Sequence, residues 1–238
     1  MKIAACAIAA CLAAGAVLPA AATAGRSPGV VWLFLVDDLH IDFRTTGVVR
    51  TWLASLVRDL VREEDAFAAR TTGPSRLSIG LLAGKADLEQ GVRRISGSAI
   101  RFADVRRMPE AAGELAYRAQ VTMKAAAALL SIAPQHDPRP CIMLYIGNGF
   151  DVIDGAVDET SDFLREAWRR DVRLIALDLG TVRTAQMPPP PAGDAEWIRV
   201  VNARRSSLEQ LALPTQGFVL AGDEALREAA VRISNAVR

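Results

Sequence analysis

The stretch Gly29–Asp42, GVVWLFLVDDLHID, decides the fold of this chain. Its first eight residues carry no charge, and the next two, Asp37 and Asp38, are adjacent carboxylates. A continuous run of apolar, β-branched and aromatic residues predicts a central strand from Val30 to Val36 that is buried on both faces. Ligands of open α/β sheets bind beyond the carboxyl ends of such strands. The acids after the strand are therefore the first candidates for a functional site.

Strands and helices are predicted to alternate along the rest of the chain. The link from Thr71 to Leu77 turns at Gly73-Pro74 and is too short for a parallel crossover, so the strand after it must run antiparallel. The other predicted strands are Ala66–Thr71, Leu77–Leu82, Cys141–Ile146, Val172–Leu177 and Gly217–Leu220; the predicted helices are Thr45–Val61, Asp87–Ile95, Glu110–Ile132, Asp158–Arg170, Ser206–Leu211 and one from an Asp223 cap to Val237. This order predicts an α/β fold, a doubly wound and mostly parallel six-stranded sheet with helices on both faces and an antiparallel third strand at an edge.

Residues 1–24 have the features of a secretory signal peptide. Lys2 gives a short basic start, Ile3 to Val17 is an apolar run, and Ala22-Thr23-Ala24 fits a cleavage site. An uncleaved anchor and an acylated Cys11 are the alternatives, and the apolar run is short for either. We therefore expect residues 25–238 to form a single exported domain, periplasmic or extracellular, with no transmembrane segment after cleavage.

Charge and cysteine content narrow the function of that domain. The chain has 28 basic and 27 acidic residues, and the leader holds one basic residue and no acid, so the exported part is formally neutral. A neutral chain is not typical of a general nucleic-acid binder. Two of the three cysteines lie in the leader, so no internal disulfide can form. The remaining one, Cys141, is expected to be a small buried hydrophobe in a strand.

Several known motifs are matched only in part. The segment Gly80–Lys85 is one residue short of a P-loop, and no Ser or Thr follows the lysine. The turn Gly147-Asn148-Gly149 lacks the third glycine of a dinucleotide loop. The pair Asp37-Asp38 is similar to the acids of phosphoacceptor receiver domains, but the third aspartate and the lysine of those domains have no counterpart. Two histidines and one cysteine in the exported part exclude a zinc site of the usual spacing.

The chain resembles the von Willebrand factor type A (vWA) domains, in particular a bacterial vWA-related family. The resemblance is carried by five segments spread in order from residue 29 to residue 238: Val36–Ile41 (VDDLHI), Ser55–Gly73, Tyr145–Asp151 (YIGNGFD), Asp171–Asp178 (DVRLIALD) and Leu208–Val237. It implies a six-stranded sheet whose third strand is antiparallel, as the strand order predicts independently. It also implies a protein partner that contacts the crown, meaning the loops near residues 38–46, 83–113 and 147–156.

The resemblance further implies a divalent-cation site at the crown, most of which is missing here. Family members that bind magnesium or manganese hold it with Asp-x-Ser-x-Ser, a threonine and a second aspartate. Asp37 matches the first position, Leu39 and Ile41 replace the serines, and Asn148 stands where the second aspartate would. No threonine stands near residues 112–114, where one is expected. We therefore expect no cofactor; magnesium or manganese would bind only weakly, through Asp37 with help from Asp38 or Asp42.

The predicted binding residues of the crown are Asp37, Asp38, His40, Asp42, Asn148 and Asp151, and no catalytic residue is assigned. Asp37 is expected to stabilise the crown by accepting hydrogen bonds from loop N–H groups around Gly147–Gly149, and His40 to be a solvated loop residue or a pH-dependent contact. A metal-assisted hydrolase using Asp37, Asp38, Asp151 and Asp178 stays open, as does a structural subunit of an envelope complex. The prolines Pro188–Pro191 are read as a stiff extended loop.

Overall fold

A computed structural model describes residues 29–108, 110–150, 157–180, 182, 184, 195–221 and 227–238 of the chain. The predicted leader, Asp151, the Pro188–Pro191 loop and the Asp223 cap lie outside the described residues. None of the helices in these ranges is long and apolar enough to cross a membrane.

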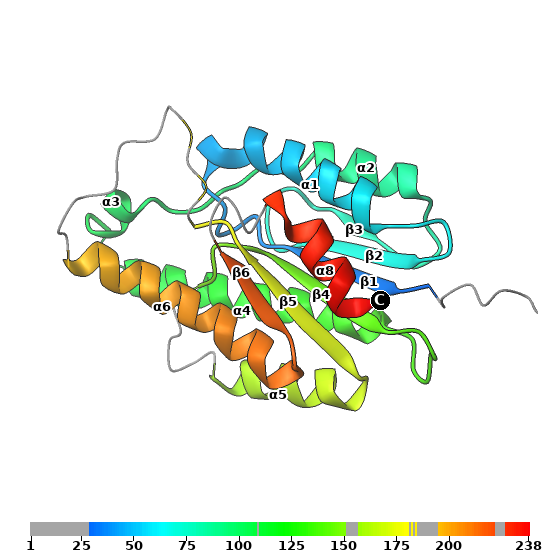
Figure 1. Ribbon diagram of the computed structural model, residues 1–238. Helices are drawn as coiled ribbons and strands as arrows, with labels where there is room; N and C mark the ends of the chain where they lie inside the picture. The colour runs from blue at the N-terminus through cyan, green and yellow to red at the C-terminus, as the bar shows by residue number, and fades with distance from the viewer. Residues whose placement is uncertain are drawn as a thin grey trace, which may run out of the picture.

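One six-stranded sheet runs through the molecule (Figure 1). Its strands lie in the order β3-β2-β1-β4-β5-β6, and their bounds are Val31–Val36 (β1), Ala66–Thr71 (β2), Ser78–Ile79 (β3), Cys141–Gly147 (β4), Val172–Asp178 (β5) and Phe218–Ala221 (β6). All neighbouring pairs are parallel except β2 and β3. The predicted fold is therefore confirmed, including the antiparallel third strand at one edge.

Helices cover both faces of this sheet, as Figure 1 shows. Their bounds are Thr46–Leu60 (α1), Lys85–Arg93 (α2), Phe102–Val105 (α3), Ala111–Ile132 (α4), Val157–Arg169 (α5), Ala195–Ala212 (α6) and Ala229–Val237 (α8), with short 3-10 helices at Phe43–Thr45 (η1) and Leu213–Thr215 (η3). The central strand β1 is buried along its whole length. Its alternate residues divide between two cores: Trp32 and Phe34 pack with α1, α2 and α8, whereas Leu33 and Leu35 pack with α4, α5 and α6.

Two predicted elements were wrong in extent. The strand predicted over Leu77–Leu82 pairs with β2 only at Ser78 and Ile79, because the chain turns at Gly80, whose carbonyl accepts from the Ala83 N–H. The helix predicted over Ser206–Leu211 extends back to Ala195 as α6. Only its last part is buried, through Ser207, Leu208, Leu211 and Ala212. In the earlier turns, Trp197 meets Phe102 of the unpredicted helix α3 edge to face.

Cys141 is confirmed as a buried strand residue. It opens β4, and its burial raises the pKa of the thiol to about 12. A thiol with so high a pKa holds its proton at neutral pH and is a poor nucleophile. The sulfur therefore acts as part of the core.

Candidate functional site

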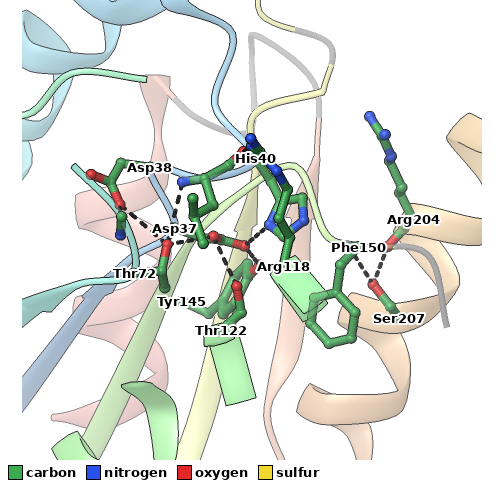
Figure 2. A network of polar contacts seen from close by, with 12 residues as sticks. Asp37, Asp38, His40, Thr72, Arg118, Thr122, Tyr145, Phe150, Arg204 and Ser207 are labelled. Atoms are coloured by element: carbon green, nitrogen blue, oxygen red, sulfur yellow. Dashed lines mark hydrogen bonds and ion pairs between the residues drawn. The ribbon is translucent and has the colours of Figure 1, made fainter. Parts of the chain in front are cut away.

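Asp37 lies at the carboxyl end of β1, and four side chains enclose its carboxylate (Figure 2). The Thr72 hydroxyl donates to Oδ1 over 2.7 Å and the Thr122 hydroxyl over 3.1 Å. His40 Nδ1 lies 2.8 Å from Oδ2, and the Tyr145 hydroxyl donates to the same oxygen. Asp37 has no exposed surface at all. Its carboxylate is thus bonded wholly within the protein.

The sheet order explains how residues so far apart in sequence meet at Asp37. β1 lies between β2 and β4, so Thr72 directly after β2 and Tyr145 within β4 flank it on either side. The alternation of β1 turns position 37 toward the face that α4 covers, and Thr122 belongs to α4. His40 lies in the loop after β1, and its side chain turns back toward Asp37. The main-chain N–H of His40 donates to the Asp37 carbonyl over 3.0 Å and holds this turn.

A glycine makes room for this arrangement. Gly147 ends β4 beside Asp37, and a Cβ added to it would come within 2.8 Å of the Asp37 Cβ. Any side chain at position 147 would therefore push Asp37 away from its donors. Two residues later, Gly149 has a positive φ of 69°, which favours glycine, and a Cβ there would lie 2.1 Å from the Arg204 carbonyl oxygen. The predicted glycine turn is thus also the point where the β4 loop packs against α6.

The electrostatics of the cluster favour an ionised Asp37 and a neutral Tyr145. Burial alone would raise the pKa of Asp37, but the electrostatic attraction of His40 and the hydrogen bonds from His40, Tyr145 and Thr72 outweigh it, so this pKa is lowered. Burial, together with the nearby Asp37 charge and hydrogen bond, raises the pKa of Tyr145 well above its usual value. The hydroxyl of Tyr145 consequently stays protonated and remains a donor.

Asp38 and Asp42 are bound elsewhere. Asp38 is fully buried and accepts hydrogen bonds from the N–H groups of Gly73 at 2.5 Å and Ser75 at 2.9 Å, which holds the loop after β2. Asp42 accepts from the Arg44 N–H at 2.8 Å, so it caps η1, and it forms an ion pair of 2.6 Å with the Arg44 guanidinium. Both carboxylates shape the crown loops, which their sequence positions alone did not show.

Arg118 of α4 connects the crown segments, a role that no pattern in the sequence indicated. Its Nη1 donates to the carbonyl oxygens of Leu39 at 3.0 Å and Ser98 at 2.8 Å. Its Nε contacts Glu114 Oε1 at 2.6 Å, which orients the guanidinium. The Ser98 N–H in turn donates to the Asp38 carbonyl over 2.8 Å. The loop after β1 and the segment around residue 98 are therefore fixed to the same helix.

Four expectations about these residues need correction. His40 is only 4% exposed, so it is not a solvated loop residue. The donors to the Asp37 carboxylate are side chains, whereas N–H groups around Gly147–Gly149 were expected. The hydroxyls near Asp37 come from Thr72 and Thr122, whereas the resemblance placed the family's threonine near residues 112–114, where none stands. Asn148 does not join the cluster: its Oδ1 is enclosed and has no hydrogen-bond partner among the described residues.

Three of the four acids named for a hydrolase lie among the described residues, and they have different partners. Asp37 binds hydroxyls and His40, Asp38 binds loop N–H groups, and Asp178 at the end of β5 accepts from the Gly180 N–H over 2.8 Å. Burial raises the pKa of Asp178, which is the direction that a general acid or base needs. Within the described ranges, no three or more His, Cys, Asp or Glu residues are grouped so that they could hold a metal ion.

No protein-family model and no curated protein matches the sequence. Solved structures do match the fold. An aerotolerance-related membrane protein from Bacteroides fragilis, crystallised with multiple mutations to serines, superposes with a TM-score of 0.54 at 12% identity over 88% of this chain and 98% of that one. The conserved hypothetical protein BatB from Bacteroides thetaiotaomicron gives a TM-score of 0.51 at 13% identity over 87% and 98%. These neighbours have vWA-like folds, and at such low identity they show the fold alone. The chain is therefore a vWA-like α/β domain.

Proposed function

We propose that this chain is an exported vWA-like module that binds a protein partner through its crown, without a bound metal ion. The observation that carries the proposal is the closed Asp37 cluster. The residue that would hold a cation is already bonded to four side chains of the protein itself. This bonding supports a crown that holds its shape without an ion.

The surface above this cluster has a feature suited to a protein contact. Phe43 in η1 is 69% exposed, and Val48 in the first turns of α1 is 46% exposed. Phe43 belongs to the crown loop that follows β1, and Val48 lies in the first turn of the helix that continues from it. Aromatic side chains are enriched among the residues that dominate binding energy at protein interfaces. Asp42 and Arg44 form an ion pair on either side of Phe43, which gives the apolar contact a polar border, as interfaces commonly have.

The test is capture of the partner by the purified exported chain from an extract of the cells that produce it, with Phe43→Ser as the variant. Leu213→Ser is the matched control, because Leu213 is 60% exposed but precedes β6 and so lies at the opposite end of the sheet. We expect Phe43→Ser to reduce recovery of the partner about tenfold, equivalent to about 1.4 kcal/mol, and Leu213→Ser to leave it unchanged. Equal recovery with both variants would contradict a crown interface.

Two alternative functions, a hydrolase and a structural subunit of an envelope complex, can each be tested. The raised pKa of Asp178 is the feature that supports a hydrolase. The hydrolase would replace the binding proposal if the purified chain turned over a substrate and if Asp37→Ala or Asp178→Asn abolished that turnover. A structural subunit of an envelope complex would instead appear as a stable assembly in native mass spectrometry, where a transient binder gives the free chain. The membrane association named for the Bacteroides fragilis protein supports an envelope setting for this chain as well.

A further inference from the structure

The short strand β3 forms one edge of the sheet (Figure 1). It pairs with β2 on its inner side, where the Thr71 N–H donates to the Leu77 carbonyl over 3.1 Å. Hydrogen-bonded and non-bonded pairs alternate along an antiparallel ladder, so the next residue, Ser78, turns its main-chain N–H and carbonyl away from β2. Neither group has a hydrogen-bond partner among the described residues. An edge with unpaired groups can accept an added strand.

A hollow of about 240 Å³ lies beside this edge. It is lined by residues 75–79 on one side and by Asp87, Gln90, Gly91 and Arg94, in or directly after α2, on the other. Gly91 allows the two sides to approach, because a Cβ added to it would lie 2.4 Å from Leu77 Cδ1. The hollow therefore borders the residue whose main-chain groups face outward.

Two exposed arginines line the hollow without a partner for their charge. Neither the Arg76 nor the Arg94 guanidinium makes an ion pair or a hydrogen bond with a described residue. By contrast, Arg44 and Arg101 each pair with an aspartate. The acid of the lining, Asp87, accepts the Gly84 N–H at 3.0 Å as the cap of α2. Two guanidinium groups and one carboxylate give the hollow a net positive charge, which suits an acidic ligand.

The backbone that presents Arg76 is strained and firmly held. Its φ is 49°, in the left-handed region that residues with a side chain rarely adopt. The Asp38 carboxylate accepts from the N–H groups of Gly73 and Ser75, and the Ser75 hydroxyl accepts from the Ser96 N–H over 2.8 Å. Strain that surrounding contacts maintain is concentrated at functional sites. Glycine at position 76 would relieve the strain but would remove a guanidinium from the hollow.

We propose that the β3 edge binds an extended, acidic segment of a partner protein. The segment adds a strand to β3 by hydrogen bonds with the main chain of Ser78, and its Asp or Glu side chain enters the hollow and binds Arg76 and Arg94. In strand addition the main chain supplies affinity and adjacent pockets supply specificity. Arginine suits this role because it forms charge-assisted hydrogen bonds with carboxylates. The inference rests on the proposed function only in that the ligand is a protein, and it adds a contact beside the crown.

The test is a selection of short random peptides, displayed on phage, against the purified exported chain. Enriched peptides are synthesised with blocked ends, and their Kd is measured by fluorescence anisotropy with the wild type, Arg76→Gly, Arg94→Ala and Arg93→Ala. Arg93→Ala is the matched control, because Arg93 is exposed and adjacent to Arg94 but does not line the hollow. We expect the peptides to share an acidic residue at a fixed position. Arg76→Gly and Arg94→Ala should each raise the Kd about tenfold, and Arg93→Ala should leave it unchanged.

Two further readouts separate binding from a structural role. Arg76→Gly relieves the positive φ, so it should melt at or above the wild-type temperature although it binds the peptide less tightly. Methylation of single main-chain nitrogens in the peptide tests strand addition. Alternate N–H groups of a strand face its neighbour, so methylation should raise the Kd at every second position.

Three results would each overturn the inference. The selection could enrich no acidic peptide, the enriched peptides could bind Arg76→Gly and Arg94→Ala as tightly as the wild type, or the methylation series could lack the two-residue period. These measurements do not involve Phe43, whose variant tests capture of the partner at the crown. A failure of the β3 site and a failure of the crown interface can thus be told apart.

Discussion

Two buried aspartates at opposite ends of the sheet are bonded in different ways. Asp37, at the carboxyl end of β1, contacts only side chains through its carboxylate: those of His40, Thr72, Thr122 and Tyr145. Asp65 precedes β2 at the amino end. It accepts from the main-chain N–H groups of Val30 and Arg62, from Trp32 Nε1, and from Arg238 over 2.7 Å. Both carboxylates have a lowered pKa, because these donors outweigh the effect of burial.

The difference concerns which residue types each end requires. Any residue except proline supplies a main-chain N–H, so half of the donors to Asp65 do not depend on side-chain identity. Asp65 joins the start of β1 to Arg238, which follows α8. The Asp37 cluster needs particular side chains from several elements, so it is the more demanding arrangement. That demand agrees with the proposed interface at the crown and with a structural role for the Asp65 end.

Asp37→Ala should have the largest effect on stability. It leaves the Thr122 and Tyr145 hydroxyls and His40 Nδ1 buried without their shared acceptor, and it leaves the Thr72 hydroxyl with Asp38 alone. Removing one partner of a buried pair costs about 3–5 kcal/mol, so the free energy of unfolding in urea should fall by that amount. The control is Asp42→Ala, whose carboxylate is partly exposed at 18% and should cost about 1 kcal/mol as a helix cap. Equal losses would show that the cluster contributes no more than a cap.

Asp65→Ala should cost less, about 1–3 kcal/mol, the cost of leaving buried donors unpaired. The Val30 N–H loses its acceptor, whereas Arg62 is exposed and its N–H can turn to water. Arg238→Ala removes the ion pair and a hydrogen bond to the Leu60 carbonyl. It should also cost about 1–3 kcal/mol, because it leaves the enclosed Asp65 carboxylate without its cation. Urea unfolding of both variants beside Asp37→Ala measures the contrast between the two ends. A loss for Asp65→Ala above that for Asp37→Ala would reverse it.

The sequence predicted the strands of the sheet better than it predicted the Asp37 cluster. β2 has the predicted bounds, Ala66–Thr71, and β1 begins one residue late, at Val31. Strands can be predicted because a buried strand has a local signature, an apolar run between turn residues. Thr72 could also have been placed at the crown, because it directly follows a strand that is parallel to β1.

The other members of the cluster had no such local signal. Tyr145 lies in an apolar run, and nothing in CIMLYIG shows that its hydroxyl meets a carboxylate 108 residues earlier in the chain. Thr122 is one polar residue in an Ala-rich helix, whose rotation about its axis depends on packing against the sheet. His40 could be placed near Asp37 by sequence, but not its burial, which requires the surrounding elements to be in position. The fold could therefore be predicted from local sequence patterns, whereas the site depends on long-range packing that such patterns do not show.

The smallest effect on the free energy of unfolding is expected at acid pH, where the carboxylates at the two ends of the sheet can be compared directly. A carboxylate whose pKa is lower in the folded state than its usual value of 3.8 stabilises the fold above that value. This contribution is lost as the pH falls from about 3.8 through the folded pKa, because the unfolded state then binds more protons. Each unit of pKa shift corresponds to about 1.4 kcal/mol. Asp37→Asn and Asp65→Asn should each flatten the fall in stability below pH 4.

Asp178 lies at the carboxyl end of β5, and its pKa is shifted in the opposite direction to that of Asp37. Burial raises its pKa, so the folded state binds the proton more tightly, and the contribution of Asp178 declines as the pH rises through the folded pKa. Asp178→Asn should therefore stabilise the protein at pH 7, because asparagine keeps an oxygen for the Gly180 N–H and no longer buries a charge. Urea unfolding between pH 3 and pH 7 measures all three variants. Two results together would contradict this account: a loss of stability at pH 7 in Asp178→Asn, and an unchanged fall in stability below pH 4 in Asp37→Asn. The fold would then need the charged carboxylate of Asp178 and not that of Asp37.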